Sequence, residues 1–292
     1  MIFVVGSTGL LGSEICRRLR TRGKRVRALA RRTADRGRLK TLEASGCQMA
    51  WGDLKDAASL AKACMGVEAV ISTASSTLSR QEGDSIESVD RLGQIALVQA
   101  AKAAGVQHFT FFGLMKEYGD SPLINAKLAF EEAVVNSGMS WTNFVGNFFM
   151  EVWFSPPLGF DYVNHKAVIY GDGRNPSSWV SYRDIAEMAV RAHETDKACN
   201  RRFMAGGPEA LSPLDVVKIF EQASGRTFHV EHIATDVLQK QFESAVDPLA
   251  KTFAGLQLAY ARGAKMNIGE TLEVFPIQLT SVKDYARTVT RA

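Results

Sequence analysis

The residue types with the clearest chemical potential form a glycine-rich loop near the start of the chain. The loop reads Gly6-Ser7-Thr8-Gly9-Leu10-Leu11-Gly12. It follows an apolar run of strand length and opens a helical pattern, a context that favours a dinucleotide-binding loop over the alternative, a glycine-rich structural turn. Gly6 would permit a sharp turn, Gly9 would let the backbone approach a pyrophosphate, and Gly12 would allow a helix to pack closely on a strand. The N–H groups and dipole of the helix N-terminus would attract the anion.

The end of the second expected strand bears on the choice of nucleotide. NAD-binding proteins commonly place an acid there to accept hydrogen bonds from the ribose hydroxyls. Here the run is Ala28-Leu29-Ala30-Arg31-Arg32, which contains no carboxylate. Arg31, supported by Arg32 or Arg36, is suited to bind a 2′-phosphate through paired charge-assisted hydrogen bonds. The other interpretation is a solvated basic face, and we expect NADP(H) as the cofactor.

Four further strand ends carry candidate cofactor-binding residues. Asp53, followed by Leu54, could accept a hydrogen bond from the adenine amino group or, equally well, cap the helix of residues 57–64. Small residues after the fourth strand would let the nicotinamide half lie against the backbone. The candidates at the fourth, fifth and sixth strand ends are Thr73, Ala74, Ser75, Gly113, Gly146, Asn147 and Phe148.

Two groups of residues beyond these strand ends could contact a substrate. Tyr118 follows the fifth strand at the carboxyl edge of the sheet, where ligands bind in such folds, so it is a candidate proton donor, although loop tyrosines are often simply exposed. Phe149, Trp153 and Phe154 belong to an aromatic cluster that could line an apolar substrate pocket. An ordinary core between two lobes explains the same cluster equally well.

The elements that must position these residues alternate in type. In the first half of the chain, helical stretches end at Gly23, Gly46, Gly66, Gly105 and Gly138, and a β-rich run follows each glycine. Glycine just past a helix accepts the left-handed conformation that stops the helix. We expect strands to start near Ile2, Arg25, Cys47, Glu68, Gln107 and Ser140. This alternation predicts an α/β fold with a doubly wound parallel sheet of the Rossmann type.

The regular alternation of expected strands and helices ends after Gly146, where residues typical of loops become frequent. We therefore expect residues 1–150 to form the NADP-binding domain and residues 151–177 and 208–292 to form a smaller substrate-binding lobe. Residues 178–207 are expected to return to the first domain.

Composition limits the class of protein. The chain has 292 residues, of which 46% are hydrophobic and 23% charged, as in globular proteins. It has no apolar run of membrane-spanning length and no signal-peptide pattern, so we expect a cytoplasmic protein with no membrane partner. Four separated cysteines without a histidine cluster predict no metal site.

Charge is concentrated at the N-terminal end. Residues 1–40 contain 12 basic and 2 acidic residues, or +10, within a chain whose formal net charge is +4. Such a segment can bind nucleic acid, but it can equally create the local field around an anionic cofactor. The glycine loop in the same segment favours the cofactor, and we expect no nucleic-acid partner.

A family resemblance rests on several runs together. They are the 6–12 loop, Arg31, Gly52-Asp53, Ala104-Gly105-Val106, Lys127 through Glu131, Ser137-Gly138, Asn147-Phe148, Met150-Glu151, Trp179-Val180-Ser181, Asp184-Ile185-Ala186 and Gly206-Gly207-Pro208-Glu209. With these runs the chain resembles the NmrA-like group of atypical short-chain dehydrogenases/reductases. The resemblance implies an NADP-binding domain, a substrate lobe and, often, reduction of quinones, aromatic compounds or conjugated double bonds. Some members of that group act instead as redox sensors or regulators.

The resemblance also assigns roles to individual residues. In ordinary short-chain dehydrogenases a tyrosine four residues before a lysine donates the proton. Lys127 matches the lysine and would hold the nicotinamide ribose, whereas Leu123 stands at the tyrosine position. Lys127 could otherwise be a solvated helix lysine. Tyr162 and Lys166 have the same spacing but lie in a loop-like region, so Tyr118 is the more plausible donor.

These observations lead to one main hypothesis and two rivals. The main hypothesis is an NADPH-dependent reductase that transfers hydride to a small aromatic, quinone-like or conjugated substrate and exists as a monomer or homodimer. The replacement of tyrosine by Leu123 supports the first rival, a catalytically inactive NADP(H)-sensing regulator. The second rival is an assembly or scaffold protein that uses the fold as a platform.

Overall fold

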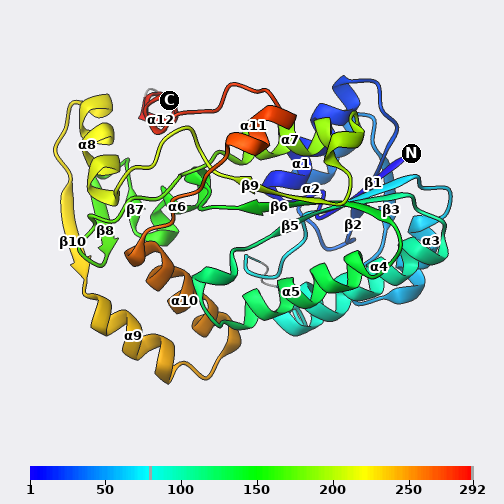
Figure 1. Ribbon diagram of the computed structural model, residues 1–292, viewed down its shortest axis with the longest axis horizontal. Coiled ribbons are helices and arrows are strands. Elements are labelled where there is room, and N and C mark those ends of the chain that lie inside the picture. The colour runs from blue at the N-terminus through cyan, green and yellow to red at the C-terminus, as the bar shows by residue number, and fades with distance from the viewer. Residues whose placement is uncertain (79–80, 291–292) are drawn as a thin grey trace. The chain divides into compact units, whose positions relative to one another are not determined.

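The computed structural model describes residues 1–78 and 81–290, which divide into two compact units (Figure 1). Unit 1 comprises Met1–Gly113, Pro122–Val145 and Ile185–Phe203. Unit 2 comprises Leu114–Ser121, Gly146–Asp184 and the described residues from Met204 onward.

Unit 1 is built on a seven-stranded sheet with the strand order β3-β2-β1-β4-β5-β6-β9. Neighbouring strands from β3 to β6 all pair in parallel. The order reverses direction beside β1, which is the mark of a doubly wound sheet. The strands are β1 (Ile2–Val5), β2 (Val26–Ala30), β3 (Gln48–Trp51), β4 (Ala69–Ser72), β5 (His108–Gly113), β6 (Ser140–Gly146) and β9 (Arg201–Ala205).

Helices cover both faces of this sheet. Figure 1 shows α1 and α7 on one side and α3, α4 and α5 on the other. The helices are α1 (Leu10–Thr21), α2 (Arg36–Ala44), α3 (Ala57–Cys64), the π-helix η1 (Ile86–Gly93), α4 (Gln94–Ala103), α5 (Pro122–Val135), α7 (Tyr182–Ala192) and the 3₁₀ turn η4 (Asp196–Ala198). The predicted α/β fold with a parallel Rossmann-type sheet is confirmed.

An apolar layer lies between the sheet and helices α3, α4 and α5. Phe109 and Phe111 alternate along β5, and both rings contact the ring of Phe130 on α5. None of these three side chains is more than 1% exposed. Apolar side chains that recur every second residue on the strands therefore pack against apolar side chains that recur every three to four residues on the helices.

The predicted helix stops are present. Gly23, Gly46, Gly66, Gly105 and Gly138 all have φ between 67° and 84°. Each strand from β1 to β6 starts at the expected residue or one residue later. These features follow from local periodicity and from the backbone freedom of glycine, so the sequence alone predicts them.

Unit 2 has a smaller sheet and more helices. Strand β8 pairs in parallel with β10 and antiparallel with β7. Helix α8 starts as predicted, with Ser212 as its cap and Pro213 at its first position. The elements are η2 (Lys116–Tyr118), α6 (Met150–Trp153), η3 (Pro156–Leu158), β7 (Phe160–Asp161), β8 (Lys166–Tyr170), α8 (Pro213–Ser224), β10 (His229–Ile233), α9 (Thr235–Ser244), α10 (Pro248–Arg262), α11 (Gly269–Val274) and α12 (Val282–Thr290).

The division into units differs from the expected domain boundaries at three places. Leu114–Ser121 and residues 146–150 belong to unit 2, although both were expected in the first domain. The reason is that the Tyr118 ring stacks on that of Phe148, 5.4 Å away, within unit 2. The returning segment is Ile185–Phe203, shorter than the expected 178–207. Contacts between distant residues set these boundaries, and strand ends alone do not reveal them.

No helix in residues 1–78 and 81–290 is long and apolar enough to span a membrane. The four cysteines are free thiols, and all but the half-buried Cys199 are buried. Burial raises the pKa of the Cys64 thiol to about 11, so this group stays protonated at neutral pH.

An ion-pair cluster fastens α7 to α1 within unit 1. Glu187 on α7 binds Arg18 at 2.6 Å and Arg22 at 2.5 Å, and it also binds Arg191 at 2.7 Å. Burial raises the pKa of Glu187, but the hydrogen bonds from the three arginines outweigh it and lower the pKa to about 2. The carboxylate therefore stays ionised through the acid range in the folded protein.

Glu187→Gln is expected to lower the free energy of unfolding at pH 7 by about 1 kcal/mol, because three guanidinium groups lose their carboxylate. The wild-type advantage should be full above the usual carboxyl pKa of 4.5 and should fade as the pH falls toward about 2. Denaturant titrations of both proteins from neutral to acid pH measure this difference in the free energy of unfolding. Glu194→Gln is the control. It removes a single, more exposed ion pair, in which Glu194 lies 3.4 Å from Arg22, so it should change stability less. A difference between the two variants that does not depend on pH would contradict this account.

Candidate functional site

The glycine loop occupies the turn between β1 and α1. Gly6 has φ of 79°, and a Cβ atom added there would lie 2.6 Å from Thr73 Oγ1. The Gly9 N–H donates to the Gly6 carbonyl at 2.9 Å, which closes the turn. Helix α1 then begins at Leu10, and no side chain caps its N-terminus. An uncapped helix start behind a tight glycine turn leaves N–H groups free for an anion.

Gly12 allows α1 to lie directly on this turn. A Cβ atom added at Gly12 would lie 2.2 Å from the Gly6 carbonyl oxygen, closer than any two such atoms can approach. Ser7 is fully buried, and its hydroxyl donates to the Leu29 carbonyl at 2.7 Å. Thr8 accepts a hydrogen bond on its carbonyl from Arg38 at 3.0 Å. The loop therefore fits a pyrophosphate, and Ser7 ties it to β2.

The arginine after β2 is paired with acids in this structure. Arg31 contacts Asp84 at 2.6 Å and Asp53 at 3.8 Å. Lys55 binds the other Asp84 oxygen and contacts Asp53 at 3.2 Å. The Asp84 side chain is only 3% exposed. A carboxylate from the segment after β4 therefore neutralises the guanidinium that was expected to bind a 2′-phosphate.

Arg32 and Asp53, two more predicted cofactor-binding residues, contact their own neighbours in this structure. Arg32 stacks over the ring of Trp51, with its guanidinium carbon 5.2 Å from the ring centre. Trp51 is 40% exposed, so the stacked Arg32 and Trp51 side chains lie at the surface at the end of β3. Asp53 accepts from the Lys55 N–H at 2.8 Å, while Asp56 caps α3. The capping role considered for Asp53 is therefore wrong, because its neighbour Asp56 performs it.

The segment after β4 is fixed by hydrogen bonds to two side chains, Asp90 on η1 and Gln94 on α4. Gln94 donates to the Ala74 carbonyl at 2.9 Å and accepts from the Ser72 hydroxyl at 2.7 Å. Asp90 accepts from both the N–H and the hydroxyl of Ser76, at 2.9 and 2.6 Å. Thr73 donates to the Val5 carbonyl at 3.2 Å, which joins the segment to β1. The small residues expected to face a nicotinamide, including Ser75, thus lie in a fixed segment beside the glycine loop.

Lys127 lies on α5, which packs against η1 in unit 1. Burial lowers the pKa of Lys127 below its ordinary value, and the charge of Asp90 opposes that shift. Leu123, at the usual tyrosine position one turn earlier, is buried at 4% exposure. Lys127 is half-buried, so it is not the freely solvated helix lysine that the sequence left open.

Gly113 and Asn143 meet at the carboxyl end of β5. The Gly113 N–H donates to Asn143 Oδ1 at 3.0 Å. Asn143 is fully buried, and its Nδ2 atom has no hydrogen-bond partner among the described residues. A Cβ atom at Gly113 would approach Asn143 to 2.9 Å, so only glycine fits at this strand end.

In unit 2, Tyr118 and Asn147 form a buried polar pair. The Tyr118 hydroxyl donates to Asn147 Oδ1 at 2.7 Å, and Asn147 Nδ2 donates to the Ala264 carbonyl at 2.6 Å. Burial raises the pKa of Tyr118 well above its ordinary value, with a contribution from Glu117. The phenol therefore keeps its proton at neutral pH, and Asn147 orients it.

The aromatic cluster predicted after β6 forms the core of unit 2. Phe148 contacts Trp153 at 4.7 Å, and Trp153 stacks on Tyr260 at 5.3 Å between ring centres. Phe154 is 2% exposed. Phe149 is half-buried. Phe154 and Trp153 thus fill a core, whereas Phe149 is the most exposed of the three residues that the sequence predicts to contact a substrate.

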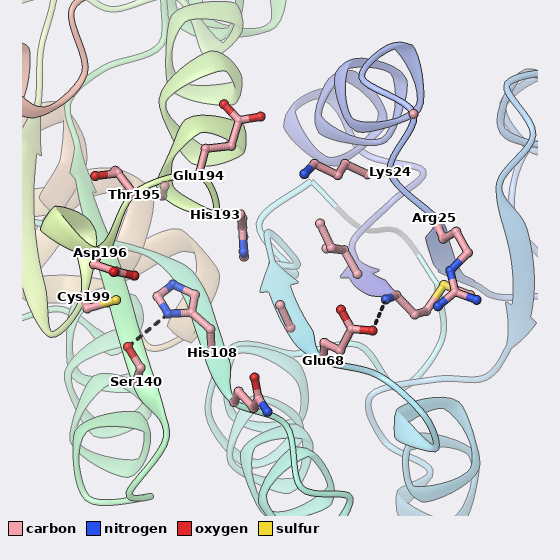
Figure 2. Close-up of a pocket in the computed structure, with 16 residues that line it drawn as sticks. Lys24, Arg25, Glu68, His108, Ser140, His193, Glu194, Thr195, Asp196 and Cys199 are labelled. Carbon is pink, nitrogen blue, oxygen red and sulfur yellow. Dashed lines mark hydrogen bonds and ion pairs between the residues drawn. The ribbon is translucent and has the colours of Figure 1, made fainter.

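A cavity of about 750 Å³ lies at the opposite, amino end of the unit 1 strands (Figure 2). His108 and His193 lie edge to face there, with ring centres 5.2 Å apart. Burial, then His108 and Lys24, lower the pKa of His193 to about 3, so it is neutral at physiological pH. The cavity contains none of the predicted site residues, and no cluster of metal-ligating side chains occurs among residues 1–78 and 81–290.

Sequence reasoning missed four polar residues that the structure brings to the carboxyl edge of the unit 1 sheet. Asp84 reaches Arg31, Lys55 reaches Asp84, Arg38 reaches the glycine loop, and Asp90 reaches Ser76. Asp90 left one detectable signal, because it lies four residues before Gln94 on an otherwise apolar helix face. Asp84 left none, since it is 53 residues from Arg31 in the chain.

Comparison with known proteins agrees with this fold and loop. Residues 1–286 match the NmrA-like family. An NAD(P)H azoreductase of Xenophilus azovorans is 33% identical over 231 residues, which cover 77% of this chain and 74% of that protein. Photosystem II assembly factor Ycf39 of Cyanophora paradoxa is 28% identical, over 82% of this chain and 73% of that protein. The chain belongs to the NmrA-like family, and the predicted family is confirmed.

A solved structure shares the whole architecture. The NADPH-dependent quinone oxidoreductase QOR2 of Escherichia coli, crystallised with NADPH, superposes with a TM-score of 0.79. The superposition covers 99% of both chains at 19% sequence identity. At that identity the likeness establishes the fold.

Gly12→Ala is expected to lower the free energy of unfolding by about 3 kcal/mol, because the new methyl group collides with a backbone carbonyl that cannot move aside. Gly9→Ala is the matched control, since its Cβ atom would lie 3.2 Å from the same oxygen. That control should cost less than about 1 kcal/mol. Denaturant unfolding of the two variants measures the difference, and equal stabilities would show that α1 can shift away from the turn.

Proposed function

We propose that the protein is an NADPH-dependent reductase that transfers hydride to a small aromatic, quinone-like or conjugated substrate. The observation that carries this proposal is the glycine loop, which ends in the uncapped N-terminus of α1 and accepts a hydrogen bond from Arg38. Ser7 ties the loop to β2, which Arg31 follows directly. An anion-binding turn flanked by guanidinium groups suits a dinucleotide with a 2′-phosphate. The identity to an NAD(P)H azoreductase, 33%, supports the same class of reaction.

The proposed binding residues follow the edge of unit 1. The backbone of residues 6–12 holds the pyrophosphate, Arg31 with Arg32 holds the 2′-phosphate, and Asp53 with Leu54 borders the adenine. Thr73, Ala74, Ser75 and Gly113 lie beside the nicotinamide half, and Lys127 holds its ribose. When bound, the cofactor supplies the hydride, and the protein supplies position and electrostatics.

The remaining proposed roles fall to unit 2. Gly146, Asn147 and Phe148 are proposed to face the cofactor, and Tyr118 or a water molecule is proposed to supply the proton. A raised pKa keeps the Tyr118 phenol protonated, which a donor requires, and its proton would have to turn from Asn147 to the substrate. Phe149, with Trp153 and Phe154 behind it, is proposed to provide the apolar surface for the substrate.

A second candidate function is assembly without turnover. The similarity to a Photosystem II assembly factor favours it. Leu123 in place of tyrosine supports the other alternative, a cofactor-sensing regulator, which the similarity to an azoreductase does not favour. A cytoplasmic location and a monomeric or homodimeric state stay predictions.

The deciding experiment is a titration of the purified protein with NADPH and NADH, followed by a panel of quinone, azo and triphenylmethane acceptors. NADPH absorbance should fall only when an acceptor is present. Arg31→Ala should raise the dissociation constant for NADPH at least about ten-fold, the lower end for a charge-assisted hydrogen bond, and should change that for NADH little.

Arg25→Ala is the matched control for that variant. Arg25 precedes β2 at its amino end, whereas Arg31 follows its carboxyl end, so loss of Arg25 should leave both affinities unchanged. Binding of NADPH without oxidation by any acceptor would favour assembly or sensing. Absence of binding to either nucleotide would overturn the proposed function.

Asp84→Asn is expected to tighten NADPH binding by about three-fold to ten-fold, because the 2′-phosphate no longer competes with a carboxylate for Arg31. The affinity for NADH, which has no 2′-phosphate, should change little. Calorimetric titration of the wild type and the variant with both nucleotides measures the effect. Asp56→Asn, which removes a carboxylate from the α3 cap nearby, is the control. Weaker NADPH binding in Asp84→Asn would indicate that Asp84 holds Arg31 in its binding position instead of competing for it.

A further inference from the structure

Two of the buried cysteines lie against each other in unit 1. Cys16 is on α1 and is 0% exposed, whereas Cys47 directly precedes β3 and is 8% exposed. The Cys16 thiol donates a hydrogen bond to the Cys47 sulfur atom. Both residues are free thiols, so the fold brings two reduced sulfur atoms into contact. Neither residue belongs to the proposed cofactor site.

The residues beside the two cysteines fix this contact. Arg20 follows Cys16 by one helical turn, so both side chains lie on the same face of α1. The Arg20 Nε atom donates to the Ser45 carbonyl at 3.1 Å. Gly46 has φ of 77°, and a Cβ atom added there would lie 2.9 Å from Arg20 Nη2. The turn that leads into β3 is therefore packed directly on α1, with Cys47 beside Cys16.

The surroundings favour ionisation of only one of the two thiols. The hydrogen bond from Cys16 lowers the pKa of Cys47, burial opposes this shift, and the positive charge of Arg20 adds to it. The same contact, together with burial, raises the pKa of Cys16 well above its ordinary value. Because the thiolate is the reactive form of cysteine, Cys47 is the nucleophile of the pair and Cys16 keeps its proton.

The position of Cys47 also gives it the better access to a small reagent. Strand β3, which Cys47 precedes, is the edge strand of the seven-stranded sheet. Cys47 keeps a small exposed fraction there, whereas Cys16 behind it has none. An accessible sulfur of lowered pKa next to a second, resolving sulfur is the arrangement that oxidation-sensitive cysteine pairs require.

We propose that Cys16 and Cys47 form a dithiol pair that hydrogen peroxide converts to a disulfide. The Cys47 thiolate attacks one peroxide oxygen, so an S–O bond forms, the O–O bond breaks, and the hydroxide that leaves takes up a proton as water. The Cys16 sulfur then attacks the sulfur of the Cys47 sulfenic acid, and the S–S bond forms as the S–O bond breaks. The proton of Cys16 leaves with that hydroxide as a second water molecule.

The disulfide would close residues 16–47 into a covalent loop. This loop contains β2, together with Arg31 and Arg38. Oxidation would therefore constrain the segment that carries the proposed phosphate-binding arginines. The inference does not rest on the proposed function, because it requires no bound nucleotide.

The test exposes the native, reduced protein to hydrogen peroxide, alkylates the remaining thiols and maps the digested peptides by mass spectrometry. One crosslinked species is expected, in which the peptides of Cys16 and Cys47 are joined, and dithiothreitol should remove it. Cys64, whose pKa burial raises to about 11, should be recovered as the alkylated thiol. Absence of the Cys16–Cys47 crosslink would overturn the inference. A mixture of pairings among the four cysteines would do the same, because it would mean that the thiols react only after unfolding.

Variants of the pair test the order of attack. Cys16→Ser should lose the crosslink and stop at the Cys47 sulfenic acid, which dimedone added together with denaturant traps. Cys47→Ser should lose both the crosslink and the trapping at the remaining member of the pair. Cys64→Ser removes a buried cysteine outside the pair and is the matched control, which should crosslink as the wild type does.

Trapping at Cys16 in the Cys47→Ser protein would contradict the proposed roles. If the two thiols only fill space in the core, the wild type and all three variants should resist peroxide equally, and that result would also overturn the inference. If Cys16→Ser does not fold, Cys16→Ala makes the same comparison without placing a hydroxyl group in the core.

Discussion

The close approach of α1 to the turn that follows β1 is the constraint on which the rest of unit 1 depends. A Cβ atom at Gly12 would lie 2.2 Å from the Gly6 carbonyl oxygen, so the helix can lie there only because the side chain is absent. That contact directs the N-terminus of α1 at the carboxyl edge of the sheet. Thr73 and Ser7 then join the turn to its neighbouring strands, through bonds to Val5 and Leu29.

Charge at this edge is more balanced than the strongly basic N-terminal segment indicates. Arg31 and Lys55 are both paired with the nearly buried Asp84, so the region has cations without a large excess of positive charge. Several other arginines of the segment bind elsewhere, for example Arg18 and Arg22, which hold Glu187 on α7. The basic segment therefore serves both the structure of unit 1 and the proposed phosphate site, and a ligand must compete with an internal carboxylate.

Each of the two units contains buried polar groups with and without hydrogen-bond partners. In unit 2 the polar side-chain atoms of Tyr118 and Asn147 are satisfied, and the aromatic rings around them form a packed core. Asp90 and Asn143 in unit 1 and Ser121 in unit 2 each keep one buried atom without a partner in the described residues. Satisfied groups stabilise a fold, whereas unsatisfied ones near a ligand edge are typical of a binding site.

The amino-acid sequence by itself determined the alternation of strands and helices, the helix stops at glycine and the dinucleotide loop, because these depend on periodicity and on backbone freedom within a few residues. It also predicted Tyr118 from its position after β5, and Lys127 from the family resemblance. Only the tertiary structure decided what the predicted side chains contact, for example Asp84 for Arg31 and Asn147 for Tyr118. Those partners lie tens of residues apart, and their meeting depends on how helices and loops pack, which no local pattern encodes.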